Sequence, residues 1–225
     1  MDRITQSFID ELLETEELTS QGDSKDFEKL ANYSIISNEY NKTFDLNFVT
    51  VGDGDDTGID GIAIIVNGLL IESSEEIDDL IEKNGFLEVE FIFIQSKTSS
   101  SFSSADLNTF IFGVKDFFSI KPKLRRNESL QKFCDISNHI YKNAPKLKCN
   151  PMCKLFYVTT GKWVNDVNLI AIVNTGKEDL EGSNLFDSVI ITPVGARELA
   201  KYYRKTKESV STTINFSNRI TIPEI

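Results

Sequence analysis

Apolar residues recur along this chain with two periods, one typical of amphipathic helices and one typical of buried strands. Spacings of three and four residues predict helices over residues 6–18, 23–38, 74–83, 104–118, 128–141, 167–180 and 196–207. Shorter, nearly continuous apolar runs predict strands over residues 44–51, 59–66, 87–97, 154–160 and 188–192, with strand-like residues continuing to the end of the chain. Because strands alternate with helices, we expect a sheet that is covered by helices on both faces.

Capping and turn residues set the expected ends of several elements. Asp23 or Ser24 can cap the second helix, and Ser104 can cap the helix that carries the Phe-rich stripe of residues 107–118. Gly85 follows an Asn and is expected to end the helix over residues 74–83. Residues 52–58 consist almost entirely of Gly and Asp, so they are expected to form a turn.

The net charge of −11 is unevenly distributed and changes the picture only when the chain is divided. Residues 1–90 contain 23 acidic and 5 basic residues, whereas residues 91–225 contain 12 acidic and 19 basic residues. The stretch 115–154 alone holds ten Lys or Arg and three Asp or Glu. Since local basic clusters hold a polyanion, the second half is a candidate nucleic-acid surface. The alternative, that these cations only decorate exposed helix faces, stays open.

Polar residues stand at the ends of two buried strands. Gln95 and Lys97 follow a run of four apolar residues and, because side chains alternate along a strand, point to one face together. Asp60 begins the preceding strand, so neighbouring strands would bring its carboxylate, the Gln95 side-chain oxygen and the Ser96 carbonyl to one hard cation such as Mg²⁺. Lys97 would then stand beside a bound water, and Glu28 would add a carboxylate through water.

This pattern resembles the PD-(D/E)XK nuclease superfamily and, more narrowly, the N-terminal domain of the abortive-infection phage-resistance (AIPR) family. The resemblance rests on GIDGIAIIVNG at residues 58–68, the acidic excursion after it, FIFIQSK at residues 91–97 and FYVTTG at residues 156–161. It implies an α/β restriction-endonuclease-like fold, with a central mixed β-sheet flanked by helices. It also implies one domain over residues 1–225, as the N-terminal part of a longer protein.

The resemblance further implies roles for four residues. Asp60 and Gln95 would be metal ligands, Lys97 the catalytic lysine, and Glu28 a further acid. Gln95 departs from the superfamily, which usually has a carboxylate at that position. A neutral amide binds a cation less strongly than a carboxylate, which lowers the expected affinity for metal.

The expected function is therefore a Mg²⁺- or Mn²⁺-dependent endonuclease that hydrolyses phosphodiester bonds in DNA, in defence against phage. The residues do not distinguish DNA from RNA. The expected partners include a C-terminal region of the full-length protein and, because a duplex has two strands to cut, a second copy of the chain. Two alternatives remain: a catalytically inactive module that binds nucleic acid or a partner protein, and a plain structural interpretation in which Gln95 and Lys97 solvate a strand end and Asp60 caps a turn.

Two further features bear on class. No apolar run approaches the length of a membrane span and the first residues lack an apolar signal core, so we expect a cytoplasmic protein with no membrane contact. Zinc bound by Cys134, His139, Cys149 and Cys153 is an alternative use of the three cysteines. Their spacing matches no common ligand pattern, so reduced, partly buried thiols are expected instead.

Overall fold

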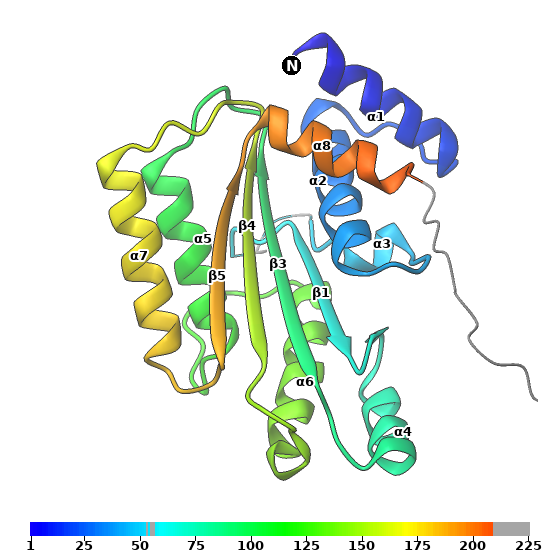
Figure 1. Cartoon of the computed structure of the whole chain (residues 1–225), viewed down its shortest axis with the longest axis vertical. Helices are drawn as coiled ribbons and strands as arrows, with labels where there is room; N and C mark the ends of the chain where they lie inside the picture. The colour runs from blue at the N-terminus through cyan, green and yellow to red at the C-terminus, as the bar shows by residue number, and fades with distance from the viewer. Residues whose placement is uncertain (53, 55–56, 209–225) are drawn as a thin grey trace, which may run out of the picture.

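The chain forms a five-stranded mixed sheet with helices packed on both faces (Figure 1). The computed structural model describes residues 1–52, 54 and 57–208. The predicted turn over residues 52–58 therefore lies partly outside the described residues, and the strand-like residues 209–225 lie wholly outside them. The sheet covered by helices on both faces, expected from the alternation of apolar runs and helical spacings, is confirmed, and the sheet is mixed, as the resemblance implies.

The strand order across the sheet is β2-β1-β3-β4-β5, so β3 is the central strand. β1 runs antiparallel to β2 and β3, whereas β3, β4 and β5 are parallel. Gly61 at the start of β1 pairs with Ile94 near the end of β3, and this pairing confirms that the strands following Asp60 and preceding Lys97 are neighbours. The strands are β1 (Gly61–Val66), β2 (Leu69–Leu70), β3 (Val89–Lys97), β4 (Met152–Thr159) and β5 (Ser188–Val194).

Two groups of helices cover the two faces of the sheet (Figure 1). One face carries α1 (Arg3–Thr15), α2 (Asp23–Glu39), the short α3 (Leu46–Val49) and α8 (Ala196–Thr206). The other carries α4 (Ser74–Asn84), α5 (Ser104–Phe117), α6 (Glu128–Lys142) and α7 (Val167–Glu181), with a 3₁₀ turn at Ala144–Lys146. Among the described residues, no helix is both long enough and apolar enough to cross a membrane.

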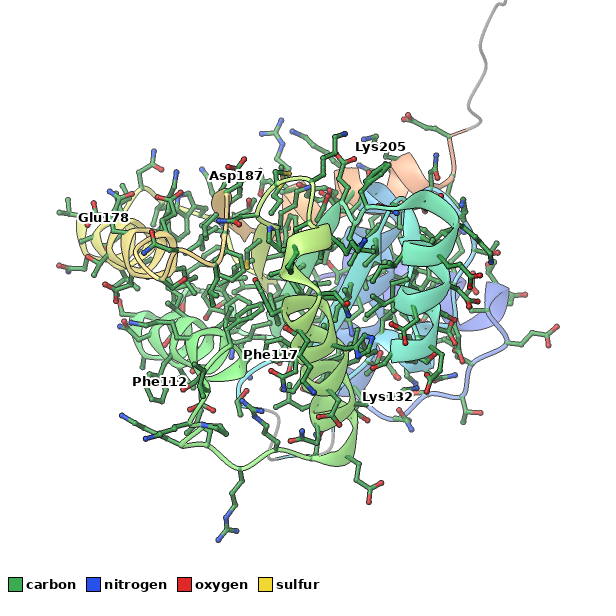
Figure 2. The ribbon with its side chains drawn as sticks, turned by 90° about the horizontal axis from the view of Figure 1, so that it is seen from below. Phe112, Phe117, Lys132, Glu178, Asp187 and Lys205 are labelled. Atoms are coloured by element: carbon green, nitrogen blue, oxygen red, sulfur yellow. The ribbon has the colours of Figure 1, made fainter. Side chains whose placement is uncertain are left out.

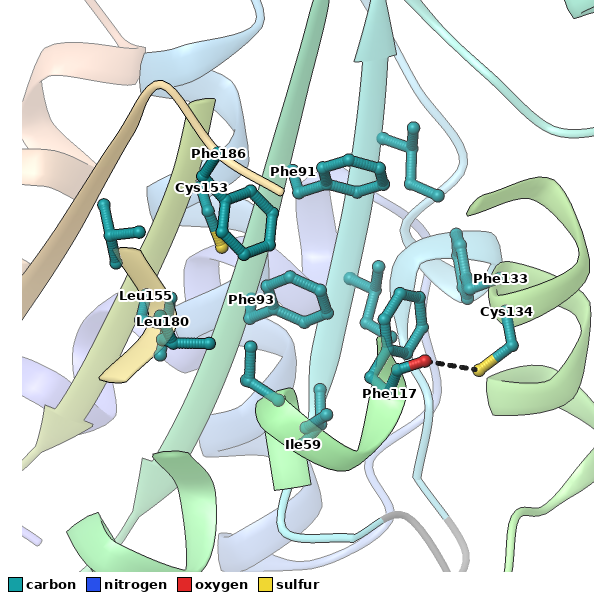
Figure 3. Close-up of a cluster of buried hydrophobic side chains, with 14 of the residues drawn as sticks. Ile59, Phe91, Phe93, Phe117, Phe133, Cys134, Cys153, Leu155, Leu180 and Phe186 are labelled. Atoms are coloured by element: carbon teal, nitrogen blue, oxygen red, sulfur yellow. Dashed lines mark hydrogen bonds between the residues drawn. The ribbon is translucent and has the colours of Figure 1, made fainter. Parts of the chain in front are cut away.

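Alternation along β3 divides its side chains between two cores. Phe91 and Phe93 point toward α5, α6 and α7, where the ring of Phe93 lies 5.0 Å from that of Phe117 (Figure 3). Ile92 and Ile94 belong to the core under α2 and α8. Gln95 continues the Phe91 and Phe93 side of the strand, which directs it under α5.

Four local predictions are wrong in detail. The first helix spans Arg3–Thr15 rather than residues 6–18, because the Asp2 carboxylate caps it by accepting the N–H groups of Ile4 and Thr5. Residues 46–49 form a helical turn rather than part of a strand, because the Asp45 carboxylate caps it at Asn47 N and Leu46 and Val49 are buried at i, i+3 spacing. The N-cap of α5 is Ser103 rather than Ser104, since the Ser103 hydroxyl accepts the N–H of Asp106. Gly22 precedes α2 without a side-chain cap, so neither Asp23 nor Ser24 has the predicted role.

Candidate functional site

Asp60 fastens the start of β1 to the end of β3. Its N–H donates to Ile94 O at 2.8 Å, and its Oδ2 accepts the Ser96 N–H at 2.6 Å and the Ser96 hydroxyl at 3.2 Å. The residue is 4% exposed. A buried carboxylate that accepts a backbone N–H is held in a fixed position. The structure thus brings Asp60 to the strand that carries Gln95, as the sequence predicts, and the Asp60 carboxylate bonds to β3.

Gln95 is buried, with 2% of its surface exposed, beneath the segment that leads into Asp60. A Cβ atom at position 58 would lie 3.1 Å from Gln95 Nε2 and 3.3 Å from Thr109 Cγ2, so Gly58 (φ +77°) leaves the room that this amide occupies. Gln95 therefore does not solvate the strand end, and that part of the plain structural interpretation is wrong.

The side-chain oxygen of Gln95 lacks a hydrogen-bond partner among the described residues. Within the described residues, Gln95 Oε1 is buried and accepts no hydrogen bond. Leaving a buried carbonyl oxygen unpaired costs about 1–3 kcal/mol. Such an atom needs an explanation, and one explanation is a ligand that completes its bonding.

Lys97 ends β3 on the same side of the strand as Gln95 and is half-buried. It is paired in the sheet with Thr159 of β4. Lys97 makes no salt bridge with any residue that the structure describes. Its ammonium group is therefore not neutralised by an acidic neighbour in this part of the chain.

Helix α2 presents a polar pair toward the same strand ends. Asn32 Nδ2 donates to Asp60 O at 3.2 Å, and Glu28 lies one turn earlier on the same face of the helix. Glu28 Oε2 lies 2.9 Å from Lys25 Nζ, and a Cβ atom at Gly52 would lie 3.7 Å from that oxygen. Glu28 thus borders the segment that leads to Asp60.

Asn32 is a site residue that sequence reasoning missed. It is fully buried, and its Oδ1 is another oxygen without a hydrogen-bond partner among the described residues. Its spacing of four from Glu28 was the available signal.

The donor set suits a hard cation and does not suit a soft one. Asp60, Gln95 and the Ser96 carbonyl offer only oxygen atoms, which Mg²⁺ and Mn²⁺ prefer. The orphaned Gln95 Oε1 is the observation that supports the fit. No group of three or more His, Cys, Asp or Glu side chains forms a metal cluster within residues 1–52, 54 and 57–208. A cation here would therefore depend on amide and backbone oxygens beside carboxylates.

The four residues considered as zinc ligands differ in burial and in their partners. Cys134 and Cys153 are buried and Cys149 is exposed, and all three are free thiols. Burial raises the pKa of the Cys134 thiol to about 12 and holds the pKa of Cys153 well above its usual value, so neither is poised as a thiolate. His139 Nε2 lies 2.7 Å from Asp78 Oδ1, which joins α6 to α4.

Comparison of the chain with protein-family models, with curated proteins and with solved structures gives no match. The functional proposal therefore rests on the resemblance described above, on the residues that carry it and on their geometry.

Proposed function

We propose that this chain is a metal-dependent nuclease domain of the restriction-endonuclease-like class. The observation that carries the proposal is the buried Gln95 Oε1, which has no hydrogen-bond partner among the described residues and lies in the strand to which the Asp60 carboxylate is bonded, near the end of the central strand. Unsatisfied buried polar atoms are few in native proteins, and a bound ion is one way in which such an atom is satisfied. A five-stranded mixed sheet with helices on both faces is compatible with the fold that the resemblance to the PD-(D/E)XK superfamily implies.

In this proposal Asp60, Gln95 and the Ser96 carbonyl would hold Mg²⁺ or Mn²⁺. A bound cation of this kind lowers the pKa of a coordinated water and offsets the negative charge of a phosphodiester. Lys97, at the exposed end of the same strand, contributes a compact positive charge to the phosphate under attack. Glu28 borders the site from α2 and orients water there. Burial of Asp60 excludes bulk water, and this strengthens each electrostatic interaction.

One observation favours a second function, binding of nucleic acid or a partner protein without catalysis. Asp60, Gln95 and Ser96 are each at most 4% exposed, so this conformation offers a phosphodiester little direct access to them. A module that kept the fold for binding alone would tolerate such burial. The role in anti-phage defence and the homodimer rest on the resemblance and on the two strands of a duplex, and light scattering tests the dimer.

The deciding experiment is cleavage of plasmid and single-stranded DNA with Mg²⁺ or Mn²⁺ by the wild type, by Lys97→Ala and by Lys162→Ala. Lys162 is exposed on the loop after β4 and provides a matched control. We expect Lys97→Ala to slow metal-dependent cleavage by about 100-fold or more, because a group that stabilises transition-state charge is lost, and the control to retain it.

Cleavage that persists in Lys97→Ala would exclude Lys97 from the reaction. If no variant cleaves, calorimetry with Mn²⁺ decides between the two functions. Binding that Asp60→Asn abolishes would support the metal site, and the absence of binding by folded wild-type protein would favour the inactive module.

A further inference from the structure

The connection between α5 and α6, residues 118–127, is a basic segment at the surface. We call it the basic loop. It contains no acidic residue and four basic ones in a protein whose net charge is −11. In Figure 2 it extends away from the body of the molecule between the labelled Phe112 and Lys132. Its cations are Lys121, Lys123, Arg125 and Arg126.

The shape of the basic loop is fixed from within by Asp116. This residue is 5% exposed, and its carboxylate accepts the N–H of Lys123 at 2.6 Å and that of Leu124 at 3.4 Å. Arg126 Nη2 donates to Asp116 O at 2.7 Å and to Phe117 O at 3.3 Å. A buried carboxylate with such partners orders the backbone around it. Of the four cations, Arg126 alone is used in these bonds.

The other three cations are presented to solvent. Lys121, Lys123 and Arg125 are exposed, and none forms a salt bridge with a residue in the described part of the chain. Elsewhere the acidic surplus does neutralise lysines: Lys115 lies 2.7 Å from Asp179, for example. An ordered group of cations that forms no salt bridge with the described residues attracts polyanions, because counterions are released when the cations bind phosphates.

The basic loop is also attached to the candidate site. Asn127, at its end, caps α6 with Oδ1 and donates from Nδ2 to Val51 O at 2.9 Å, Gly52 O at 3.1 Å and Gly54 O at 3.0 Å. Gly52 also approaches Glu28, since a Cβ atom at Gly52 would lie 3.7 Å from Glu28 Oε2. One asparagine thus joins the basic loop to the segment that borders the proposed metal ligands.

From these observations we propose that Lys121, Lys123 and Arg125 contact the sugar–phosphate backbone of the nucleic acid that the candidate site cleaves. This inference rests on the proposed function. Contacts of this kind position the nucleic acid without reading its sequence. The loop that carries these cations is bonded through Asn127 to Gly52, which lies beside Glu28. A nucleic acid whose phosphates are bound by the loop can therefore extend toward the strand ends that carry Asp60 and Gln95.

An anionic membrane is the competing partner, because Ile120 at the tip of the loop is 98% exposed. Burying one isoleucine contributes only about 1.5–3 kcal/mol. Stable attachment to a membrane takes a larger apolar face or a second anchor. The residues next to Ile120, which are Ser119 and residues 121–123, are polar, basic or proline. The attachment of the loop beside the candidate site therefore favours nucleic acid.

The test is fluorescence anisotropy with a labelled DNA duplex and its RNA counterpart, in EDTA and over a range of salt concentrations. It compares the wild type with the triple variant Lys121→Ala/Lys123→Ala/Arg125→Ala. A matched control, Arg197→Ala/Lys201→Ala/Lys205→Ala, removes the same charges from exposed positions on α8, across the sheet (Figure 2). All six side chains are exposed, so both triples are expected to melt as the wild type does.

We expect the loop triple variant to bind nucleic acid at least about tenfold more weakly than the wild type. The plot of log K against log salt should become less steep by about 2–3, the value for three lost phosphate contacts. The control should change little. The same losses on RNA alone would support the inference and assign RNA as the substrate. Equal losses of affinity in both triple variants, or no loss in the loop triple variant, would overturn the inference. It would also be overturned if the loop cations were needed for binding to anionic vesicles while the protein bound neither duplex. Since no metal is present, failure of catalysis does not affect the result.

Discussion

Replacing Gln95 by methionine separates a functional role of this residue from a structural one. Gln95 is 2% exposed and its Oε1 has no hydrogen-bond partner in the described part of the chain. Methionine has nearly the same length and no carbonyl oxygen, so Gln95→Met removes the cost of an unsatisfied buried acceptor. That cost is about 1–3 kcal/mol, of which we expect about 1–2 kcal/mol to return as stability after repacking. For a chain of this size, this corresponds to a rise in Tm of about 2–8 °C.

The assay is thermal unfolding of wild type and Gln95→Met, with and without Mn²⁺. A ligand that binds only the folded state stabilises it, by about 2.7 kcal/mol at a concentration of 100 Kd. We expect the wild type to be the less stable protein without metal and to gain stability when Mn²⁺ is added. Gln95→Met should be more stable without metal, should gain little from Mn²⁺, and should not cleave DNA.

Gln95→Glu is the matched control, because it introduces the carboxylate that the superfamily usually has at this position. A second buried negative charge beside Asp60 should lower stability without metal and enlarge the Mn²⁺-induced rise in Tm. A Gln95→Met protein with a lowered Tm and an unchanged response to Mn²⁺ would refute a role of the Gln95 oxygen in binding metal. Gln95 would then be a packing residue whose amide contributes to stability.

Two further predictions concern charges away from the site. Burial alone would raise the pKa of Asp26, but bonds from the Gln21 N–H and the Ser20 hydroxyl and the nearby Lys29 hold it below its usual value. The Asp26 carboxylate therefore stabilises the fold above its unfolded pKa of about 3.9, and this stabilisation is lost as the pH falls through the lower folded pKa. In urea unfolding, the difference in free energy of unfolding between wild type and Asp26→Asn should shrink below that pH. A difference that stays constant with pH would contradict a lowered pKa for Asp26. Lys154 Nζ lies 2.6 Å from carboxylate oxygens of both Glu39 and Glu90. Lys154→Met should lower the free energy of unfolding by about 1–3 kcal/mol, less than the loss of a fully buried pair, because all three side chains are partly exposed. An unchanged urea midpoint would show that the two glutamates need no cation.

Local signals were sufficient for most elements and insufficient where the chain had two local choices. The helices of residues 23–38, 74–83 and 167–180 were predicted within one residue of their observed ends, because apolar spacing marks all three, Asn84-Gly85 ends the second and Asp166 caps the third. Residues 44–51 offered β-branched and aromatic residues to a strand and an Asp cap to a helix. The cap prevailed, since Thr50 makes an isolated bridge to Gly61 and residues 44–49 pair with no strand in the described part of the chain.

By itself, the sequence determined which residues stand at strand ends and which face of the strand they share. Periodicity of two fixed Gln95 and Lys97 on the Phe93 side of β3, and the apolar runs fixed β1 and β3 as buried strands. Only the tertiary structure decided that β1 and β3 are neighbours in the register that places Asp60 at Ser96, and that Gly58 and α5 enclose Gln95. The physical reason is that periodicity acts between residues a few positions apart, whereas register and burial depend on packing between segments more than thirty positions apart, as Asp60 and Ser96 are.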